Sequence, residues 1–110
     1  MIVWFVAAAL LAQASAPPVP AAKPAAVVHL KDFKYAPATV KIKAGESVEW
    51  INDDGDAHTV DSVTKAFDSG GLDTHDTWTH VFNTPGTFAY FCDLHPYMKG
   101  VVIVEKGTAK

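Results

Sequence analysis

The chain has 110 residues, which is enough for one domain. It carries 9 basic residues, all of them lysine, against 12 acidic ones, for a formal net charge of −3. A mildly acidic chain without arginine lacks the basic face that nucleic-acid binding needs, and its 1 cysteine excludes an internal disulfide framework.

The first residues have the pattern of an export signal. Ile2 to Ala12 form an unbroken apolar run, which is shorter than the about 20 residues of a membrane-spanning helix. Ala14 and Ala16 then give the small-residue spacing of a cleavage site. No lysine precedes the run, so an uncleaved anchor or a misplaced start is the alternative. We predict a signal peptide over residues 1–16, a periplasmic protein, and no membrane insertion after cleavage.

The next segment separates this signal from the domain. Residues 17–26 are rich in proline and alanine and have no apolar period, which predicts an extended spacer. The domain is predicted over residues 27–106, followed by a tail over 107–110. A core of this size without a disulfide is of marginal stability, so a bound metal is the obvious additional source.

Short segments of period two fill the predicted domain. The alternation is clearest in Thr39–Lys43, Ser47–Asn52 and Thr77–Asn83, and it is typical of half-buried strands. Further strands are predicted near Val28, Leu30 and Phe33, and over His58–Val60, Thr87–Cys92 and Val101–Glu105. Residues 62–76 predict a long loop with a short helix or a distorted strand. The absence of a helical period favours an all-β sandwich or barrel.

Charge is unevenly spread along this domain. Seven aspartates lie between Asp53 and Asp76, against Lys65 alone. Two interpretations are open: the segment forms solvated loops, or it is a docking or steering surface for a basic partner.

The most informative motif is a Cys-x-x-His-x-x-Met run made by Cys92, His95 and Met98. Thiolate, imidazole and thioether together suit copper best, because two histidines and one cysteine with a weak axial methionine form an electron-transfer copper site. The second imidazole must come from elsewhere, and His58, which follows a dense turn, is the best candidate. The predicted metal ligands are therefore His58, Cys92, His95 and Met98.

Each of these residues also has a structural interpretation when taken alone. A single cysteine is often a buried apolar residue, a methionine is often part of a core, and a histidine after a turn is often exposed. Their joint spacing favours the metal site. The remaining histidines are interpreted as having no ligand role: His29, His75 and His80.

The run from Gly86 to Gly100 closely resembles the C-terminal copper loop of the cupredoxins, the small blue copper proteins, and the spacing from His95 to Met98 is most similar to the amicyanin type. Segments 33–40, 44–50 and 58–60 resemble upstream parts of the same family. The resemblance covers nearly all of residues 27–105. The copper loop is a specific signal, whereas the upstream segments alone would be weak ones.

The resemblance implies a cupredoxin-like Greek-key β-sandwich of about eight strands. It also implies one type 1 copper ion, with His58, Cys92 and His95 as strong ligands and Met98 as the axial one. Many members have proline before the first histidine and asparagine after it, where this chain has Ala57 and Thr59. Since that asparagine ties two ligand loops together, the Thr59 hydroxyl would have to replace it here.

The implied function is one-electron transfer by a monomer between redox partner proteins. An amine dehydrogenase and a c-type cytochrome are the partners suggested by the family analogy. Four protein ligands leave no open position for a substrate, which argues against an enzyme. Pro96 and Tyr97 would form an apolar rim around His95, the expected exit for electrons. Two alternatives remain: a copper-delivery or storage protein, and a binding module whose metal is structural or is zinc.

Overall fold

The computed structural model describes residues 23–107, so the predicted signal peptide and most of the predicted spacer lie outside the described residues. Within this range the chain forms only strands and irregular segments, and it has no helix long and apolar enough to cross a membrane. The strands are β1 (Ala26–Lys31), β2 (Lys34–Ala36), β3 (Thr39–Lys43), β4 (Glu46–Asn52), β5 (Asp61–Ser62), β6 (Thr77–Phe82), β7 (Gly86–Phe91) and β8 (Lys99–Glu105).

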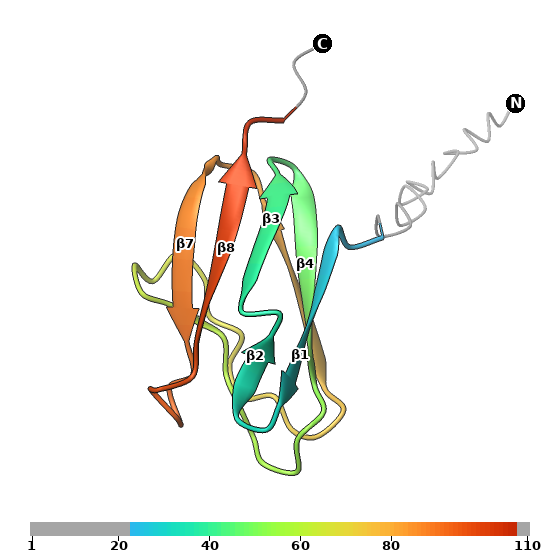
Figure 1. The fold of residues 1–110 in the computed structure, drawn as a ribbon, viewed down its shortest axis with the longest axis vertical. Coiled ribbons are helices and arrows are strands. Elements are labelled where there is room, and N and C mark those ends of the chain that lie inside the picture. Colours follow the sequence, from blue (N-terminus) through green and yellow to red (C-terminus); the bar gives the residue numbers. More distant parts are fainter. Residues whose placement is uncertain (1–22, 108–110) are drawn as a thin grey trace, which may run out of the picture.

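The strands form two four-stranded sheets that pack face to face (Figure 1). One sheet has the order β2-β1-β4-β6 and the other the order β3-β8-β7-β5. The pairs β1–β4 and β3–β8 are parallel, and the other neighbours are antiparallel. The prediction of an all-β sandwich of about eight strands is confirmed.

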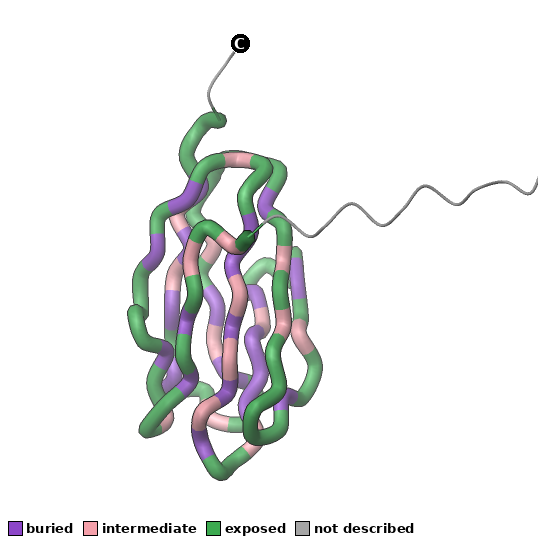
Figure 2. Tube along the Cα trace, turned by 90° about the vertical axis from the view of Figure 1, so that its right-hand side faces the viewer, coloured by how far each residue is buried: buried purple, intermediate pink, exposed green. Residues whose placement is uncertain are grey.

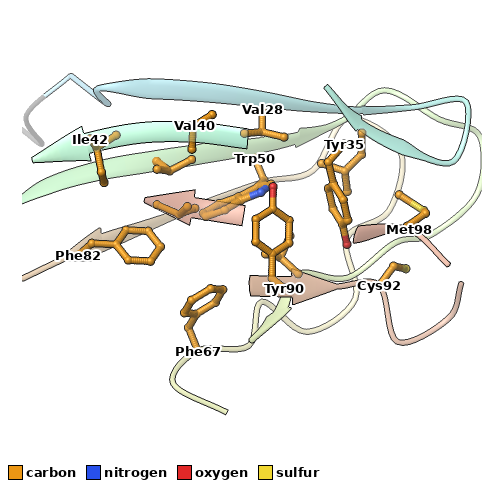
Figure 3. Close-up of a cluster of buried hydrophobic side chains, with 14 of the residues drawn as sticks. Val28, Tyr35, Val40, Ile42, Trp50, Phe67, Phe82, Tyr90, Cys92 and Met98 are labelled. Carbon is orange, nitrogen blue, oxygen red and sulfur yellow. The ribbon is translucent and has the colours of Figure 1, made fainter. Parts of the chain in front are cut away.

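The core follows from the period of two in the strands. Buried and exposed residues alternate along β1, β3 and β8, as Figure 2 shows for the whole trace. Trp50 and Tyr90 lie at the centre with rings 5.5 Å apart and an interplanar angle of 88°. Cys92, Met98 and Tyr35 lie at one end of this core (Figure 3), so the apolar layer continues directly into the region of the predicted metal ligands.

Phe33 lies elsewhere than the sequence predicts. The sequence predicts it within the first strand, but β1 ends at Lys31, and Asp32 and Phe33 form a tight turn into β2. Both turn residues have positive φ, 54° and 58°. Two successive residues of this kind are the mark of a two-residue hairpin turn, which aspartate tolerates far better than phenylalanine does.

The segment after β4 also differs from the expectation. Residues 62–76 form the expected long loop, with isolated bridges at Asp68 and Leu72 and no helix. The strand expected over 58–60 is reduced to a single bridge between His58 and Leu72. The cause is visible in the backbone: the amide of Thr59 donates to a sulfur and that of Val60 donates to a side-chain hydroxyl, so neither joins a strand ladder. Pairing resumes at β5.

Three connecting segments meet at one end of the sandwich, away from the C-terminus (Figure 1). They are the β1–β2 turn, the loop that follows β4, and the β7–β8 loop that carries the Cys-x-x-His-x-x-Met run. Loops at one end of a rigid β-scaffold are well placed to bring distant residues together.

Candidate metal centre

The β7–β8 loop closes on itself by backbone hydrogen bonds. The amide of His95 donates to the Cys92 carbonyl at 3.2 Å, and the amide of Met98 donates to the His95 carbonyl at 2.8 Å. The amide of Cys92 then donates to the Met98 carbonyl at 3.2 Å. These bonds fold the loop into two successive turns, and this explains why the three motif residues are spaced by three.

His58 is held from the opposite side by the single bridge to Leu72. Its amide donates to the Leu72 carbonyl at 3.0 Å, and the Leu72 amide returns a bond of 2.8 Å. The side chain of Asn52, which is fully buried, donates to the carbonyls of Leu72 and Asp56, both at 2.8 Å. The loop that carries His58 is therefore fixed without a regular strand.

These two loops bring three donor atoms together. Cys92 Sγ lies 3.8 Å from His58 Nδ1 and 3.7 Å from His95 Nδ1, and all three ligand atoms lie within 4.8 Å of one another. With bonds of about 2.0 Å to imidazole nitrogen and about 2.3 Å to thiolate sulfur, an ion at the centre of a trigonal set would hold nitrogen and sulfur about 3.7 Å apart. The observed spacing fits one metal ion.

Met98 is placed to supply a fourth donor. Its side chain is buried, with 2% of its surface exposed, and Figure 3 shows it beside Cys92 at the end of the core. Two nitrogens and a thiolate with a nearby thioether are a soft, mixed donor set that suits copper better than magnesium or calcium.

The donors differ in their access to solvent. His58 and Cys92 are fully buried, while His95 is half-buried and reaches the surface. Beside it, Leu94 and Tyr97 are 55% and 68% exposed. Pro96 and Tyr97, the predicted apolar rim, are both exposed beside the partly exposed His95.

Asp54 is a site residue that the sequence analysis missed. Its Oδ2 accepts a hydrogen bond of 2.7 Å from His58 Nε2, which leaves Nδ1 free to face the other donors. The same carboxylate accepts the amides of Asp32 at 2.8 Å and Phe33 at 3.0 Å. Burial by itself raises the pKa of Asp54, but the bonds from Phe33, His58 and Asp32 outweigh it and hold the pKa below its ordinary value.

Phe33 is a second such residue. Its ring meets His58 and His95 edge to face, with centroids 5.3 Å and 4.9 Å away. The ring therefore covers both imidazoles on one side, and the Asp54 carboxylate holds the strained turn in place through the two amides. Only the coincidence of a left-handed turn and a carboxylate 21 residues later reveals this role, and no local pattern signals it.

Thr59 connects the two ligand loops, which is the role that the family resemblance gives to asparagine. Its amide donates to Cys92 Sγ at 3.3 Å, and its hydroxyl accepts the amide of Asp93 at 2.8 Å. Its carbonyl accepts the phenol of Tyr35 at 2.5 Å. Thr59 thus stands where the resemblance implies asparagine, and it joins the two ligand loops through its amide and its hydroxyl.

The other histidines lie outside this cluster. His29 is exposed and bonds Asp53 at 2.6 Å, and His80 stacks on Trp78, where burial lowers its pKa. His75 has a left-handed backbone, with φ of 72°, in the loop before β6. Within residues 23–107, the one group of three or more His, Cys, Asp or Glu donors close enough to share an ion is the one described above.

Comparison with known proteins identifies the family. A model of the cupredoxin-like domain matches residues 1–104. Amicyanin-alpha of Methylorubrum extorquens is 37% identical over 83 residues, which cover 71% of this chain and 70% of that protein. Plastocyanin of Scenedesmus fuscus is 33% identical over 84 residues, covering 64% of this chain and 86% of the relative.

Solved structures agree with this assignment. The Cu(I) form of an amicyanin mutant superimposes with a TM-score of 0.71 at 31% identity, covering 78% of this chain and 87% of that chain. A copper-containing nitrite reductase of Thermus scotoductus shares the fold alone, with a TM-score of 0.72 at 24% identity over 23% of its chain. Together with the His58, Cys92 and His95 cluster, these matches show that the chain belongs to the cupredoxins and that its cofactor is one type 1 copper ion.

Proposed function

We propose that this protein is a soluble one-electron carrier in which His58, Cys92 and His95 bind copper strongly and Met98 binds it axially. The observation that carries the proposal is the trigonal set of one sulfur and two Nδ1 atoms, buried at the end of a β-sandwich. When bound there, copper supplies a centre that gains or loses one electron, as Cu(II) or Cu(I).

The chain's contribution is to keep this donor set still. Cys92, His95 and Met98 are joined by backbone bonds, and His58 is fixed by Leu72 and Asp54. Side chains that are locked by packing and by supporting hydrogen bonds hold one geometry closely. A site that keeps its shape in both oxidation states needs little rearrangement for each electron, which favours transfer over catalysis on a bound substrate.

Electrons would enter and leave through His95. It is the one strong ligand candidate that reaches the surface, and exposed Leu94, Pro96 and Tyr97 surround it. An exposed apolar group of this kind is typical of a surface that another protein covers. A partner docked here would lie against the imidazole edge.

Burial argues against the delivery and storage alternative. Handing the ion to an acceptor requires that the acceptor's ligands displace the chain's own, and His58, Cys92 and Met98 are each at most 2% exposed. A zinc module is also disfavoured, because thioether is a poor zinc ligand and the chain places a buried methionine beside the thiolate.

The periplasmic location, the monomeric state and the partners are also part of this proposal. The apolar run before Ala14 and Ala16 supports export. Likeness to amicyanin supports an amine dehydrogenase as electron donor and a c-type cytochrome as acceptor. These partners rest on analogy with the family rather than on a surface of this chain.

Protein-film voltammetry combined with a copper-transfer assay tests the carrier against its alternatives. We expect a reversible one-electron wave from the copper-loaded protein and slow loss of the ion to an excess of a Cu(I) chelator. An absent or irreversible wave contradicts the carrier. Rapid passage of the ion to an apo-acceptor at rates that exceed electron exchange supports delivery instead.

A further inference from the structure

Two aspartates face each other beside the copper loop. Asp61, in β5, and Asp68 form an isolated antiparallel bridge. Residues directly opposite each other in an antiparallel pair have Cβ atoms about 4.5–5.5 Å apart, so these two carboxyl groups can share a hydrogen bond when one carries a proton. They border a pocket of about 480 Å³ that is also lined by Lys65, Phe67 and Asp93.

One oxygen of this pair has no donor. Oδ1 of Asp61 is buried and has no hydrogen-bond partner among the described residues, whereas Oδ2 accepts the Thr59 hydroxyl at 3.2 Å. A buried oxygen without a hydrogen-bond donor is unfavourable, and so is the repulsion between two neighbouring carboxylates. A single proton between Asp61 and Asp68 would satisfy the oxygen and remove the repulsion between like charges.

The proton belongs on Asp61 rather than on its neighbour. Asp68 is exposed, and its Oδ1 accepts the amide of Gly70 at 2.8 Å, which favours the charged form. The free oxygen of Asp61 is buried, so Asp61 is the member of the pair that carries the proton and donates the hydrogen bond. The exposed member gives the pair an open route for exchange of the proton with solvent.

A short chain of bonds joins this pair to the copper sulfur. The Thr59 hydroxyl donates to Asp61 Oδ2 and accepts the amide of Asp93, while the Thr59 amide donates to Cys92 Sγ at 3.3 Å. Thr59 therefore bonds on one side to the pair and on the other to the thiolate. Hydrogen bonds and charge around the cysteine sulfur set the reduction potential of such copper sites.

We propose that Asp61 and Asp68 share a proton and act through Thr59 on Cys92, so that protonation of the pair raises the reduction potential of the bound copper. This inference rests on the copper site of the proposed function. The sign follows from charge. Oxidation adds a positive charge to the site, so an ionised carboxylate nearby stabilises the oxidised form and lowers the potential, and neutralising it does the reverse.

The surroundings of Asp61 support titration in an accessible range. Burial raises its pKa, and the facing Asp68 and the nearby Asp93 raise it further, against the hydroxyl of Thr59, to about 6. Lys65 lines the same pocket. Burial raises the pKa of the Tyr35 phenol, and nearby charges that include Asp61 raise it further, so Tyr35 stays neutral. The potential should therefore fall as the pH rises through this range.

The pair itself can be observed without redox chemistry. We suggest recording the ¹³C shifts of the aspartate carboxyl carbons in the zinc-loaded protein, because zinc has no redox chemistry of its own. Asp61 should titrate with a midpoint near pH 6, and Asp68 well below it. Replacing Asp68 by asparagine should move the Asp61 midpoint down, because the amide removes the like charge and donates to Oδ1.

The reduction potential then tests the link to copper, and two substitutions should act in opposite directions. Asp61→Asn imitates the protonated pair and should hold the potential at the wild-type value of low pH. Asp68→Asn leaves Asp61 ionised and should hold the potential close to the wild-type value of high pH, slightly above it because the charge of Asp68 is gone. Asp73→Asn removes an exposed charge from the same loop and should leave the wild-type pH dependence unchanged.

The outcomes separate this inference from the proposed function. If both variants keep the full wild-type pH dependence, the pair does not act on copper, even though the carrier stands. Two independent titrations at ordinary aspartate values in the zinc form would overturn the shared proton itself. Failure of the copper protein to cycle at all would contradict the carrier and leave the carboxyl titration as a separate result.

Discussion

Asp54 supports the candidate metal site through its contacts with His58 and the β1–β2 turn. Its carboxylate fixes the ring of His58 through Nε2 and at the same time fixes the turn that places Phe33 over both imidazoles. A carboxylate behind a ligating histidine selects the tautomer and raises the basicity of the ligand. One side chain thus determines the orientation of a ligand and the cover above it.

Replacing Asp54 by alanine should weaken copper binding by about 10–100-fold, because removal of such a supporting partner typically costs that much. Asp54→Asn should lose less copper affinity, since the carbonyl of its side chain can still accept one hydrogen bond. Competition with a chelator measures the affinity, and circular dichroism of the apo-protein checks the fold. Asp56→Ala, at an exposed position in the same loop, is the control. Equal affinities for Asp54→Ala and this control would refute the supporting role.

Tyr97 tests the proposed exit for electrons. Tyr97→Asp puts a charge at this exposed position beside His95. It should slow electron exchange with a partner protein at least several-fold while leaving the absorption of the copper site intact. Stopped-flow kinetics measures the rate. Val81→Asp places the same charge on an exposed residue of β6, which pairs with Ser47 at the end of β4 far from Asn52 and the metal site, and it should have little effect. Equal slowing by both would show that net charge, not the surface around His95, is responsible.

At the level of strands, β7 and β8 bring the copper loop and the core together. Tyr90, in β7, is 1% exposed, and its ring lies directly over Gly100 at the start of β8. A side chain at Gly100 would overlap that ring. This close approach, just after Met98, fixes where the copper loop rejoins the sheet.

Gly100→Ala should therefore lower the free energy of unfolding of the apo-protein by about 1–3 kcal/mol, the usual cost of overpacking a core. Urea denaturation measures it. Gly71→Ala, where an added Cβ meets nothing within 4 Å, is the matched control. A stability of Gly100→Ala equal to that of the control would show that the Tyr90 ring moves aside freely.

The sequence predicts the regular elements and fails where long-range bonds replace them. Period two identified β3, β4 and β6 within a residue or two, because burial on one face imposes it. β2 is only three residues long and follows a turn in which Phe33 adopts an unfavourable φ. That conformation depends on Asp54, a contact between distant segments that no local pattern contains.

The candidate ligands were found for a similar reason. Cys92, His95 and Met98 lie in one loop, so their spacing alone indicates their chemistry. His58 lies outside that loop, and it is selected because a second imidazole is required and it follows a dense turn; the family resemblance then agrees. Asp54 and Asp61 remained hidden among seven aspartates of the same segment, because their roles come from burial and partners rather than from residue type.

For the molecule as a whole, a bound metal would join segments that are far apart in the chain. His58 and Cys92 are 34 residues apart and approach one another only in the folded state. The described core contains no disulfide, since its one cysteine is in the site. Binding of an ion to the native state alone therefore adds directly to stability.

Copper loading should raise the free energy of unfolding by about 4 kcal/mol when free copper is about 1,000 times its dissociation constant. Scanning calorimetry of the apo- and copper-loaded forms should show a correspondingly higher melting temperature for the latter. Cys92→Ala should remove most of this difference. Identical melting temperatures for the two forms of the wild type would mean that the ion does not hold the two loops together.

The most direct test of the metal centre is a visible absorption titration with Cu(II), because the thiolate–copper bond itself produces the colour. The wild type should develop an intense blue band that saturates at one copper per chain and bleaches on reduction. Cys92→Ser should stay colourless, and His58→Ala should lose or strongly shift the band. A wild type without the band, or a Cys92→Ser variant that retains it, would contradict the assignment of these residues to one copper ion.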